Sequence, residues 1–414
     1  MAINQYAFPR EYGGITRTFD LLSRLRGWDF RIVSSARHHT TGEVMRSSDP
    51  RFTLLPVPAY DTNGVKRILG WFVFAAEAFL YGLTRPCDLI FASSPQLLAP
   101  VAGLALAAVR RKPFVLEIRD LWPESLVSGG SLKEGSLVHR LLVAVERTLY
   151  QKADQIIVVT TGWEEHFRAL GIDLRKLTVV PNGADPDDFD IPESKQELRQ
   201  RLGLKRFTAI FSGSHSPYVG LDLILDAAAQ VPDVDFLLIG SGSRKPWAID
   251  EAARRQLENV RFHPQVPKNQ LAALLKAGDA GLHTVTPQSV FNMGMSPNKL
   301  FDYMAAGLAV VSNARQPLRG VIRDDEVGAV VGPRDLAEGI RRVRDADPAT
   351  VERWKHRAGQ LMAERFSLQA SAGALQGALD QALDRTMRHE FPPFPADNDK
   401  RDGHPIAAPT AGPR

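Results

Sequence analysis

Short apolar runs rich in β-branched residues recur along the chain, and each is followed by a polar or glycine-containing turn and then by a stretch with helical spacing. Several runs are apolar at successive positions, which is typical of parallel strands that helices cover on both faces. This alternation predicts an α/β fold with two doubly wound domains in tandem and a cleft between them. The expected strands are 29–35, 52–57, 88–94, 113–120, 155–161 and 177–183, followed by 207–213, 234–242, 260–266, 280–285 and 308–313.

Between the two groups of strands the chain loses the apolar pattern and reads VVPNGADPDDFDIPES (179–194). Proline, glycine and acidic residues at this density indicate a connection between domains. We therefore expect an N-terminal domain over residues 1–183, a linker over 184–200 and a C-terminal domain over 201–384. Residues 385–414 hold six prolines and little that could be buried, so a disordered tail is expected there.

The composition is that of a soluble globular protein, with 44% hydrophobic and 24% charged residues among 414. No apolar run reaches the roughly 18 residues that a membrane span needs, and the nearest one, 68–83, carries Glu77. The chain has one cysteine and no recognisable signal peptide, so a reducing cytoplasm is the expected location. The opening MAINQY leaves only a stub for a first strand, so either that strand is short or the natural chain begins upstream.

Positive charge is concentrated in the first part of the chain. Residues 1–180 hold 22 Lys and Arg against 17 Asp and Glu, whereas the remainder holds 29 against 30. Together with the apolar segment 68–83, this bias predicts peripheral contact with the anionic inner face of the cytoplasmic membrane, with Trp71 and Phe72 as anchors. The alternative is an ordinary core helix of the first domain. No basic run is interleaved with aromatic residues, so nucleic acid is not an expected partner.

The segment SPNKLFDYMAAGLAVVSN (296–313) predicts a short helix followed by a strand. Ser296 is suited to the N-cap, Pro297 to the first helical position and Gly307 to the helix end. The amides at such a helix start favour an anion, and Lys299 adds a full positive charge there, which gives half of a phosphate site. The alternative is a surface ion pair between Lys299 and Asp302, three residues apart.

Four blocks carry a resemblance to a known family: NQYAFPREYGGITR near the start, LEIRDLWPES (116–125), VVPNGAD at the domain junction and the segment 296–313. Together they resemble the retaining glycosyltransferases of family 4, which have the GT-B fold of two Rossmann-like domains. The second and fourth blocks are similar to the branch that transfers N-acetylated amino sugars, such as N-acetylfucosamine, in O-antigen and capsule assembly. The resemblance implies an acceptor-binding N-terminal domain and a nucleotide-sugar-binding C-terminal domain.

The sequence departs from the pattern of that family at two places. The family usually carries two glutamates separated by seven residues, and here the second maps onto Asp302 while the first falls on Gly294. A lysine that commonly precedes the glycine in the first loop of the second domain is replaced by Val219, before Gly220. Lys299 is expected to take over the phosphate-binding charge.

The expected site residues follow from the motifs and the resemblance. Glycines after the first strand stub would let the backbone approach a sugar or diphosphate, although an ordinary turn would also use them. Charged residues at the end of a buried strand lie where open α/β sheets bind ligands, with an internal ion pair as the alternative. The expected catalytic residues are Arg119, Asp120, Glu124 and Lys299. The expected donor-binding residues are Gly13, Gly14, Gly213, Ser214, His283, Gly294, Ser296, Asn298, Lys299 and Asp302.

No metal or other cofactor is expected, because every D-x-D sequence lies at a turn or in the tail rather than directly after a strand. The expected function is a retaining, metal-independent transfer of a sugar from a UDP-sugar to a lipid-linked saccharide. Two alternatives remain: a UDP-sugar 2-epimerase of the same fold, and a non-catalytic subunit that binds nucleotide sugars. A dinucleotide dehydrogenase is disfavoured because no G-x-G-x-x-G follows the first strand.

Overall fold

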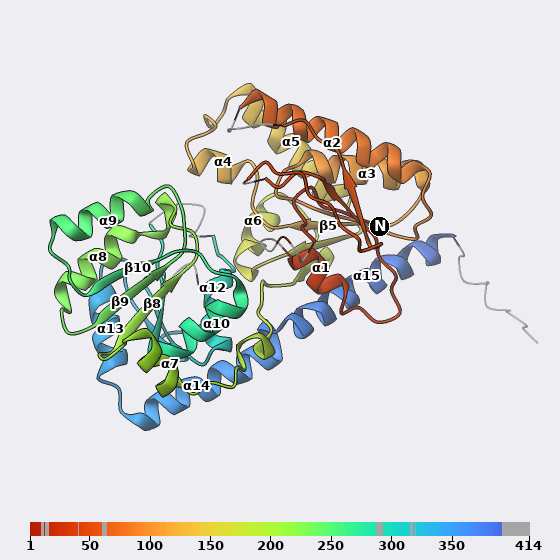
Figure 1. The fold of residues 1–414 in the computed structure, drawn as a ribbon. Helices are drawn as coiled ribbons and strands as arrows, with labels where there is room; N and C mark the ends of the chain where they lie inside the picture. Colours follow the sequence, from red (N-terminus) through yellow and green to blue (C-terminus); the bar gives the residue numbers. More distant parts are fainter. Residues whose placement is uncertain are drawn as a thin grey trace, which may run out of the picture.

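The computed structural model describes residues 1–9, 12, 16–39, 41–59, 64–286, 293–314, 318 and 320–390. The described chain forms two parallel sheets, each enclosed by helices, and a long helix that returns from the second domain to the first (Figure 1).

The N-terminal sheet has seven parallel strands in the order β3-β2-β1-β4-β5-β6-β7. The strands are β1 (Ala2–Ile3), β2 (Ile32–Ser35), β3 (Phe52–Leu55), β4 (Ile90–Ser93), β5 (Phe114–Ile118), β6 (Gln155–Val158) and β7 (Leu177–Val179). The helices are α1 (Arg17–Leu22), α2 (Val65–Leu83), α3 (Leu98–Arg110), α4 (Glu124–Ser128), α5 (Leu137–Lys152), η2 (Thr161–Trp163), α6 (Glu164–Ala169) and η3 (Leu174–Lys176). Strands β2, β4, β5 and β6 are buried at every position, which fits their largely apolar sequences, although each also buries a polar residue, such as Glu117 in β5.

The C-terminal sheet has six parallel strands in the order β10-β9-β8-β11-β12-β13. The strands are β8 (Thr208–Ser212), β9 (Asp235–Ile239), β10 (Val260–His263), β11 (Ala280–His283), β12 (Ala309–Ser312) and β13 (Gly328–Val330). The helices are η4 (Pro186–Phe189), α7 (Lys195–Leu202), η5 (Pro217–Val219), α8 (Leu221–Gln230), α9 (Lys245–Arg254), α10 (Lys268–Ala277), α12 (Asn298–Ala305), α13 (Leu336–Arg344), α14 (Pro348–Leu361) and η6 (Met362–Phe366).

The predicted fold class of two doubly wound domains is confirmed, and each of the eleven expected strands contains an observed one. The sequence reading missed β13. A Cβ on Gly328, the first residue of this short strand, would lie 2.1 Å from Val310 O, so the close pairing of β13 with β12 depends on a glycine that ordinarily argues against a strand.

The last helix, α15 (Leu368–Glu390), packs on the N-terminal domain rather than on the C-terminal one. Its buried residues Leu375 and Leu379 belong to the same apolar cluster as Phe19 and Val115 of the first domain. The expected extension of the C-terminal domain to residue 384 is therefore corrected at this helix. Residues 385–390 are helical rather than part of a tail, and 391–414 lie outside the described residues.

The chain crosses from the first domain to the second and later back again, and both crossings lie at the same place. Ala184, leaving the first domain, forms an isolated parallel bridge with Ser367, where the chain returns. Beside this crossing, the buried Arg17 donates hydrogen bonds to the carbonyls of Val180 and Pro181 at 2.7 Å each and to Glu117 at 3.0 Å. These contacts fix the chain where it leaves the first sheet.

The segment 68–83 lies within α2, whose inner face is part of the core of the first domain, with Phe74 and Ala78 buried. Trp71 also turns inward, because its indole N–H donates to the Tyr6 hydroxyl at 2.6 Å and its ring contacts Trp122. Its expected role as a membrane anchor is therefore wrong, whereas Phe72 is exposed. Within the described ranges, no helix is long and apolar enough to cross a membrane.

Candidate active site

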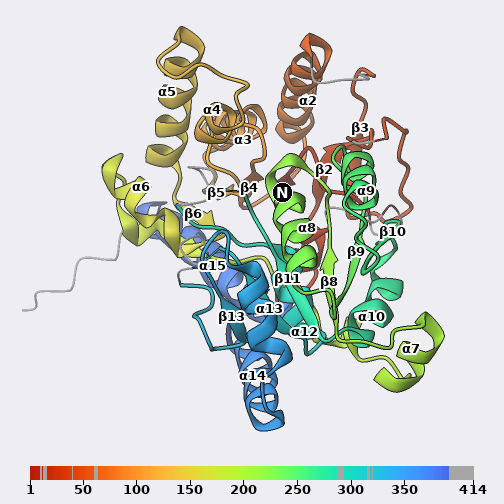
Figure 2. The ribbon, with the colours of Figure 1, turned by 90° about the vertical axis from the view of Figure 1, so that its left-hand side faces the viewer.

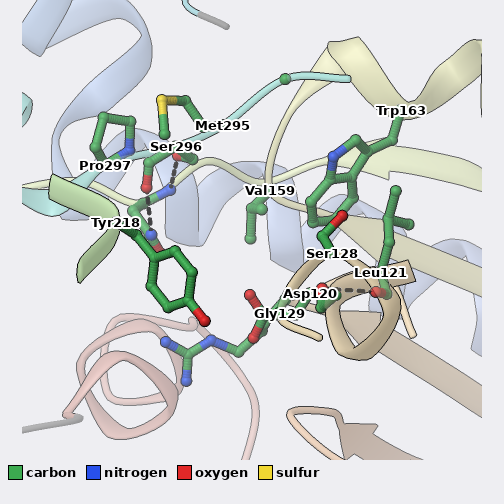
Figure 3. A pocket seen from close by; sticks show the side chains of 14 residues that line it. Asp120, Leu121, Ser128, Gly129, Val159, Trp163, Tyr218, Met295, Ser296 and Pro297 are labelled. Carbon is green, nitrogen blue, oxygen red and sulfur yellow. Dashed lines mark hydrogen bonds between the residues drawn. The ribbon is translucent and has the colours of Figure 1, made fainter. Parts of the chain in front are cut away.

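A pocket of about 410 Å³ lies between the two domains (Figure 3). Figure 3 shows Tyr218, Met295 and Pro297 on one side and Leu121 and Ser128 on the other. The lining residues of the N-terminal domain and junction are Arg119, Asp120, Leu121, Ser125, Ser128, Gly129, Val159, Trp163 and Asn182, and those of the C-terminal domain are Tyr218, Gly294, Met295, Ser296 and Pro297.

The charged residues after β5 reach this pocket as predicted. The backbone N–H of Arg119 donates to Ser94 Oγ at 3.0 Å, which fixes the chain after β5. Its guanidinium acts to lower the pKa of Asp120, but this effect is the smaller of two opposing ones. Asp120 is exposed at the pocket mouth, but desolvation of its carboxyl by the surrounding walls outweighs Arg119 and raises its pKa. Glu124 is not among the pocket residues. Desolvation raises the pKa of the buried Tyr150, and the charges of Glu146 and then of Glu124 add to this rise.

The chain before α12 joins the two domains. Asn182 donates its backbone N–H to Ser296 Oγ at 2.9 Å and its side-chain amide to the Ser296 carbonyl at 2.6 Å. The expectation that Ser296 caps the helix is therefore wrong: α12 begins at Asn298, with Pro297 at the N-cap and no side-chain cap. The predicted helix end is close to the observed one, because α12 stops at Ala305 and Gly307 follows with φ +71°.

Lys299 lies in the first turn of α12 and turns toward the end of β8. Its ammonium lies 3.9 Å from the centre of the Phe211 ring, and a Cβ on Gly213 would lie 3.2 Å from Lys299 Cε. In the described part of the chain, no carboxylate forms a salt bridge with Lys299. Desolvation lowers its pKa to about 7. A partly buried cation without a counter-charge is what we expect at a site that binds an anion.

Two buried histidines flank this cation. His283 ends β11 with Nδ1 2.8 Å from Ser312 Oγ, and its pKa is lowered to about 3 by desolvation and then by Lys299. His215 was missed by the sequence reading: both ring nitrogens are buried without a hydrogen-bond partner among the described residues. Desolvation, followed by Lys245 and Lys299, lowers the pKa of His215 to about 4. Both imidazoles are therefore neutral, and neither supplies a negative charge that could balance Lys299.

The position of α12 is set by Tyr303, which is fully buried. Its hydroxyl accepts from the Ser212 N–H at 2.9 Å and donates to the Leu282 carbonyl at 3.1 Å, so the helix is tied to the ends of β8 and β11. A Cβ on Gly281 would lie 2.3 Å from the Tyr303 ring, which leaves room only for glycine beneath the helix.

Asp302 does not pair with Lys299. Its carboxylate lies 3.9 Å from Lys268, which itself binds Asp188 at 2.9 Å. Desolvation raises the pKa of Asp302 to about 6; Lys268 opposes this rise and Asp188 adds to it. The alternative interpretation of 299 and 302 as one surface ion pair is therefore wrong, and the two charges face different neighbours on one helix.

Gly294, where the first family glutamate would fall, has φ +122° and lies against Gly162 of the N-terminal domain. Gly213 and Ser214 follow β8 and are exposed, as is Asn298 at the start of α12. The predicted donor-binding residues Gly13 and Gly14 lie outside the described residues.

Several pocket residues were not predicted. Asn182 lies in the VVPNGAD block, so its motif was recognised but its side chain was not assigned. Tyr218 directly precedes Val219, where the departure from the family pattern was noted; a Cβ on Gly129 would lie 3.3 Å from its hydroxyl, so it reaches across the pocket. Ser125 and Ser128 carry no signal in the sequence beyond their place on α4.

A metal centre has no candidate in the described residues, since no group of three or more His, Cys, Asp or Glu side chains could hold an ion there. Metal independence itself stays a prediction.

Residues 13–183 match the family described as "Glycosyl transferase 4-like domain", and residues 194–360 match "Glycosyl transferases group 1". Among curated relatives, the "Probable glycosyltransferase WbjE" of Pseudomonas aeruginosa is 26% identical over 83% of this chain and 84% of its own length. The "D-inositol 3-phosphate glycosyltransferase" of Mycolicibacterium smegmatis is 28% identical over 72% of this chain and 75% of its own length.

Solved structures agree in fold. Anabaena Alr3699/HepE in complex with UDP and glucose superposes with a TM-score of 0.68 at 18% identity, over 92% of this chain and 98% of that one. The sucrose-phosphate synthase (tll1590) from Thermosynechococcus elongatus gives a TM-score of 0.71 at 18% identity, over 93% and 98%. The chain is therefore a glycosyltransferase of the GT-B fold, in which a glycosyl transferase 4-like domain precedes a glycosyl transferases group 1 domain.

Proposed function

We propose that this glycosyltransferase moves an N-acetylated amino sugar from a UDP-sugar to a lipid-linked saccharide, with retention of configuration and without a metal ion. The observation that carries the donor part is Lys299, a partly buried ammonium without a carboxylate partner in the described structure. It is not among the pocket-lining residues, but it follows the lining residue Pro297 by two positions and lies over Phe211. A desolvated cation of this kind gains most from a polyanion, and the diphosphate of a nucleotide sugar supplies one.

The diphosphate of the donor becomes more negative as its bond to the sugar breaks. Lys299 and the backbone N–H groups at the start of α12 are held in place by Tyr303 before any ligand arrives. Such preorganised groups stabilise the leaving group without the cost of reorganisation, which is the role that a divalent cation has in other transferases. Asp302, one turn further, accepts from the ribose hydroxyls in this proposal.

The acceptor enters from the N-terminal side of the pocket. Asp120 orients the acceptor hydroxyl, and Arg119 faces a phosphate of the lipid link. The hydroxyls of Ser125 and Ser128 add neutral hydrogen-bonding groups of the kind that saccharides use. Glu124 is given no role with the acceptor, because it does not line the N-terminal side of the pocket and its charge acts on the buried Tyr150.

The relatives support the type of donor and the class of reaction in this proposal. HepE structures contain UDP or UDP-glucose, and WaaG, which is 18% identical with a TM-score of 0.65, is described as a glycosyltransferase involved in lipopolysaccharide biosynthesis. The choice of an N-acetylated amino sugar rests on the resemblance of the blocks 116–125 and 296–313.

The test is to incubate the protein with a panel of UDP-sugars, with and without a lipid-linked saccharide, and to follow UDP release and the anomeric configuration of the product. We expect acceptor-dependent UDP release and a retained anomer, with UDP-N-acetyl amino sugars the best donors. Formation of a new UDP-sugar without acceptor would indicate the epimerase instead. Donor binding without any turnover across the panel would indicate a non-catalytic binding subunit.

A further inference from the structure

Tyr218 presents its ring to the pocket from the C-terminal domain. Its side chain is 41% exposed, and in the described part of this domain Ile249 is the other exposed large apolar residue, at 43%. Tyr218 lines the pocket, whereas Ile249 lies on α9 and does not. An aromatic ring that stays exposed in a pocket offers apolar area that a ligand can cover. Neither the donor contacts nor the acceptor contacts of the proposed function use this ring.

The backbone around Tyr218 is fixed by the chain that follows β11. The Tyr218 carbonyl accepts from the Thr286 N–H at 3.0 Å, and the Val219 carbonyl accepts from the Thr284 hydroxyl at 2.5 Å. Val219 packs against the apolar core of the domain, while the neighbouring Tyr218 remains exposed. The short helix η5 is therefore anchored, and it sets the base of the Tyr218 side chain before a ligand arrives.

The tip of Tyr218 reaches the N-terminal domain. Its hydroxyl would lie 3.3 Å from a Cβ on Gly129, the residue that follows α4. Figure 1 shows α4 at the end of its domain nearest the C-terminal domain, and Figure 2 shows the same helix above α8, which begins just after η5. Ser125 and Ser128 of α4 and the nearby Asp120 line the pocket on this side, and in Figure 3 the Tyr218 ring lies across the pocket from Ser128. A ligand held among these groups touches both domains.

An aromatic face opposite hydroxyl and carboxylate groups is suited to a sugar ring. The C–H bonds on one face of a pyranose are apolar and pack on an aromatic ring, while its hydroxyls form hydrogen bonds with carboxylate and hydroxyl oxygens. Asp120 and the two serines of α4 can supply such oxygens. Ser125 already donates its hydroxyl to the Leu121 carbonyl at 2.7 Å, so its oxygen is left to accept. A hydrocarbon chain in the same place would leave these polar groups without partners.

We infer that the ring of Tyr218 stacks on the pyranose that carries the acceptor hydroxyl, opposite Asp120 and α4. This inference rests on the proposed function and names a residue of the C-terminal domain that selects the acceptor. The acceptor fits better than the donor, because the diphosphate site proposed at Lys299 lies over Phe211, and neither of these residues lines the pocket. Tyr218 instead faces the side of the pocket from which the acceptor enters.

The test compares the full-length protein with Tyr218→Ala, Tyr218→Phe and the matched control Ile249→Ala. Steady-state kinetics with a UDP-sugar and a lipid-linked saccharide give a separate KM for each substrate. Tyr218→Ala should raise the acceptor KM about tenfold, because the apolar face of the sugar loses its cover, and should change the donor KM by less than about twofold. Tyr218→Phe keeps the ring and should stay within about threefold of the parent in both. Ile249→Ala removes a side chain of similar exposure outside the pocket and should match the parent.

Binding is measured independently of turnover by saturation-transfer NMR in the presence of UDP. The probes are the methyl glycosides of N-acetylglucosamine, N-acetylgalactosamine, glucose and galactose. We expect saturation transfer to at least one of them in the parent, in Tyr218→Phe and in Ile249→Ala, and its loss in Tyr218→Ala. All three variants should melt within about 2 °C of the parent, since both substituted side chains are exposed.

Three outcomes would overturn the inference. A donor KM that rises as much as the acceptor KM in Tyr218→Ala would mean that the ring stacks on the donor or only holds the domains together. An equal loss in Tyr218→Phe and Tyr218→Ala would assign the effect to the hydroxyl, and no saturation transfer to any glycoside in the parent would remove the sugar site. If no UDP-sugar is consumed while glycoside binding follows Tyr218, the proposed function fails and the sugar site stands.

Discussion

Gly162 of the N-terminal domain and Gly294 of the C-terminal domain lie back to back across the domain interface. A Cβ on Gly162 would lie 2.8 Å from the Gly294 Cα and 2.3 Å from the Met293 carbonyl oxygen, distances that packed atoms do not reach. The backbone of the chain before α12 therefore rests directly on the turn that contains Trp163. This contact closes one side of the pocket and fixes how near the two domains come.

Gly162→Ala should hold the domains apart, because backbone on the other side cannot yield to the added methyl group. We expect kcat/KM for the donor to fall by about ten- to a hundredfold, as catalytic groups from the two domains no longer meet at the right distance. Unfolding free energy should change by less than about 1 kcal/mol, because opening relieves the clash. Small-angle scattering should show a more extended particle.

The control for this variant is Gly373→Ala on α15, where an added Cβ meets nothing within 4 Å. It should leave activity and shape unchanged and stabilise the helix by about 0.5–1 kcal/mol. Parent-like kinetics in Gly162→Ala would mean that the Gly162–Gly294 contact has no part in closure.

The sequence predicted what depends on local pattern. Buried parallel strands such as β5 and β9 are apolar at successive positions, so their places could be read directly. The path of α15 could not, because an apolar helical face does not reveal which domain covers it; the contacts with Phe19 and Val115 of the first domain appear only in the folded chain. Strand β13 was not predicted, because glycine is uncommon in strands. The reason for Gly328 becomes clear only in the folded chain, where Val310 leaves no room for a Cβ.

Some residues of the candidate site were also predicted from local pattern, and others were not. Arg119 and Asp120 follow a buried strand, so the rule for strand ends placed them correctly at the pocket. Ser296 fits the composition of an N-cap, but the two hydrogen bonds with Asn182, 114 residues away, hold it outside the helix. His215 has no local signal, since its environment comes from Lys245 and Lys299 on other elements.

Chelation should leave turnover unchanged. The described residues hold no cluster of metal-binding side chains, and in the proposed function Lys299 supplies the positive charge that faces the diphosphate. We expect the initial rate of UDP release in excess EDTA to stay within about twofold of the rate in magnesium. If EDTA abolishes the rate and magnesium or manganese restores it, the metal-free proposal is wrong.

The donor should bind less well as pH rises through neutrality. Desolvation holds the pKa of Lys299 at about 7 in the unliganded protein, so the cation that attracts the diphosphate is lost above that pH. The diphosphate of a sugar nucleotide keeps its charge over this range, so we expect log kcat/KM for the donor to fall toward a slope of about −1 above pH 7. Lys299→Arg, which stays charged, should remove this fall even if its absolute rate is lower. A profile that is the same in both proteins would assign the fall to another group.

Removing either charge of α12 should make the protein more stable and less active. Lys299 has a folded pKa of about 7 against an ordinary value of 10.5, so the unfolded chain binds more protons between these values and the stability cost is largely in place at pH 7. Asp302 has a folded pKa of about 6 against 3.8, so stability is lost as pH rises from 3.8 to 6 and this cost is also present at pH 7. Lys299→Met and Asp302→Asn should each raise the free energy of unfolding at pH 7 by about 1 kcal/mol, or the melting temperature by roughly 2–4 °C.

Activity should separate the two roles. Lys299→Met removes a charge-assisted contact to phosphate worth about 1.5–3 kcal/mol, and the loss should fall mainly on kcat because the leaving group is most negative in the transition state. Asp302→Asn keeps the shape but weakens the acceptance of hydroxyl hydrogen bonds, so the donor KM should rise more than kcat falls. Lys205→Met, at an exposed lysine of the same domain, is the control and should change neither stability nor kinetics. A structural role would give the opposite sign, because removing a charge that holds the fold together lowers the melting temperature. Both variants melting below the parent with parent-like kinetics would therefore rule out an anion site kept vacant for the donor.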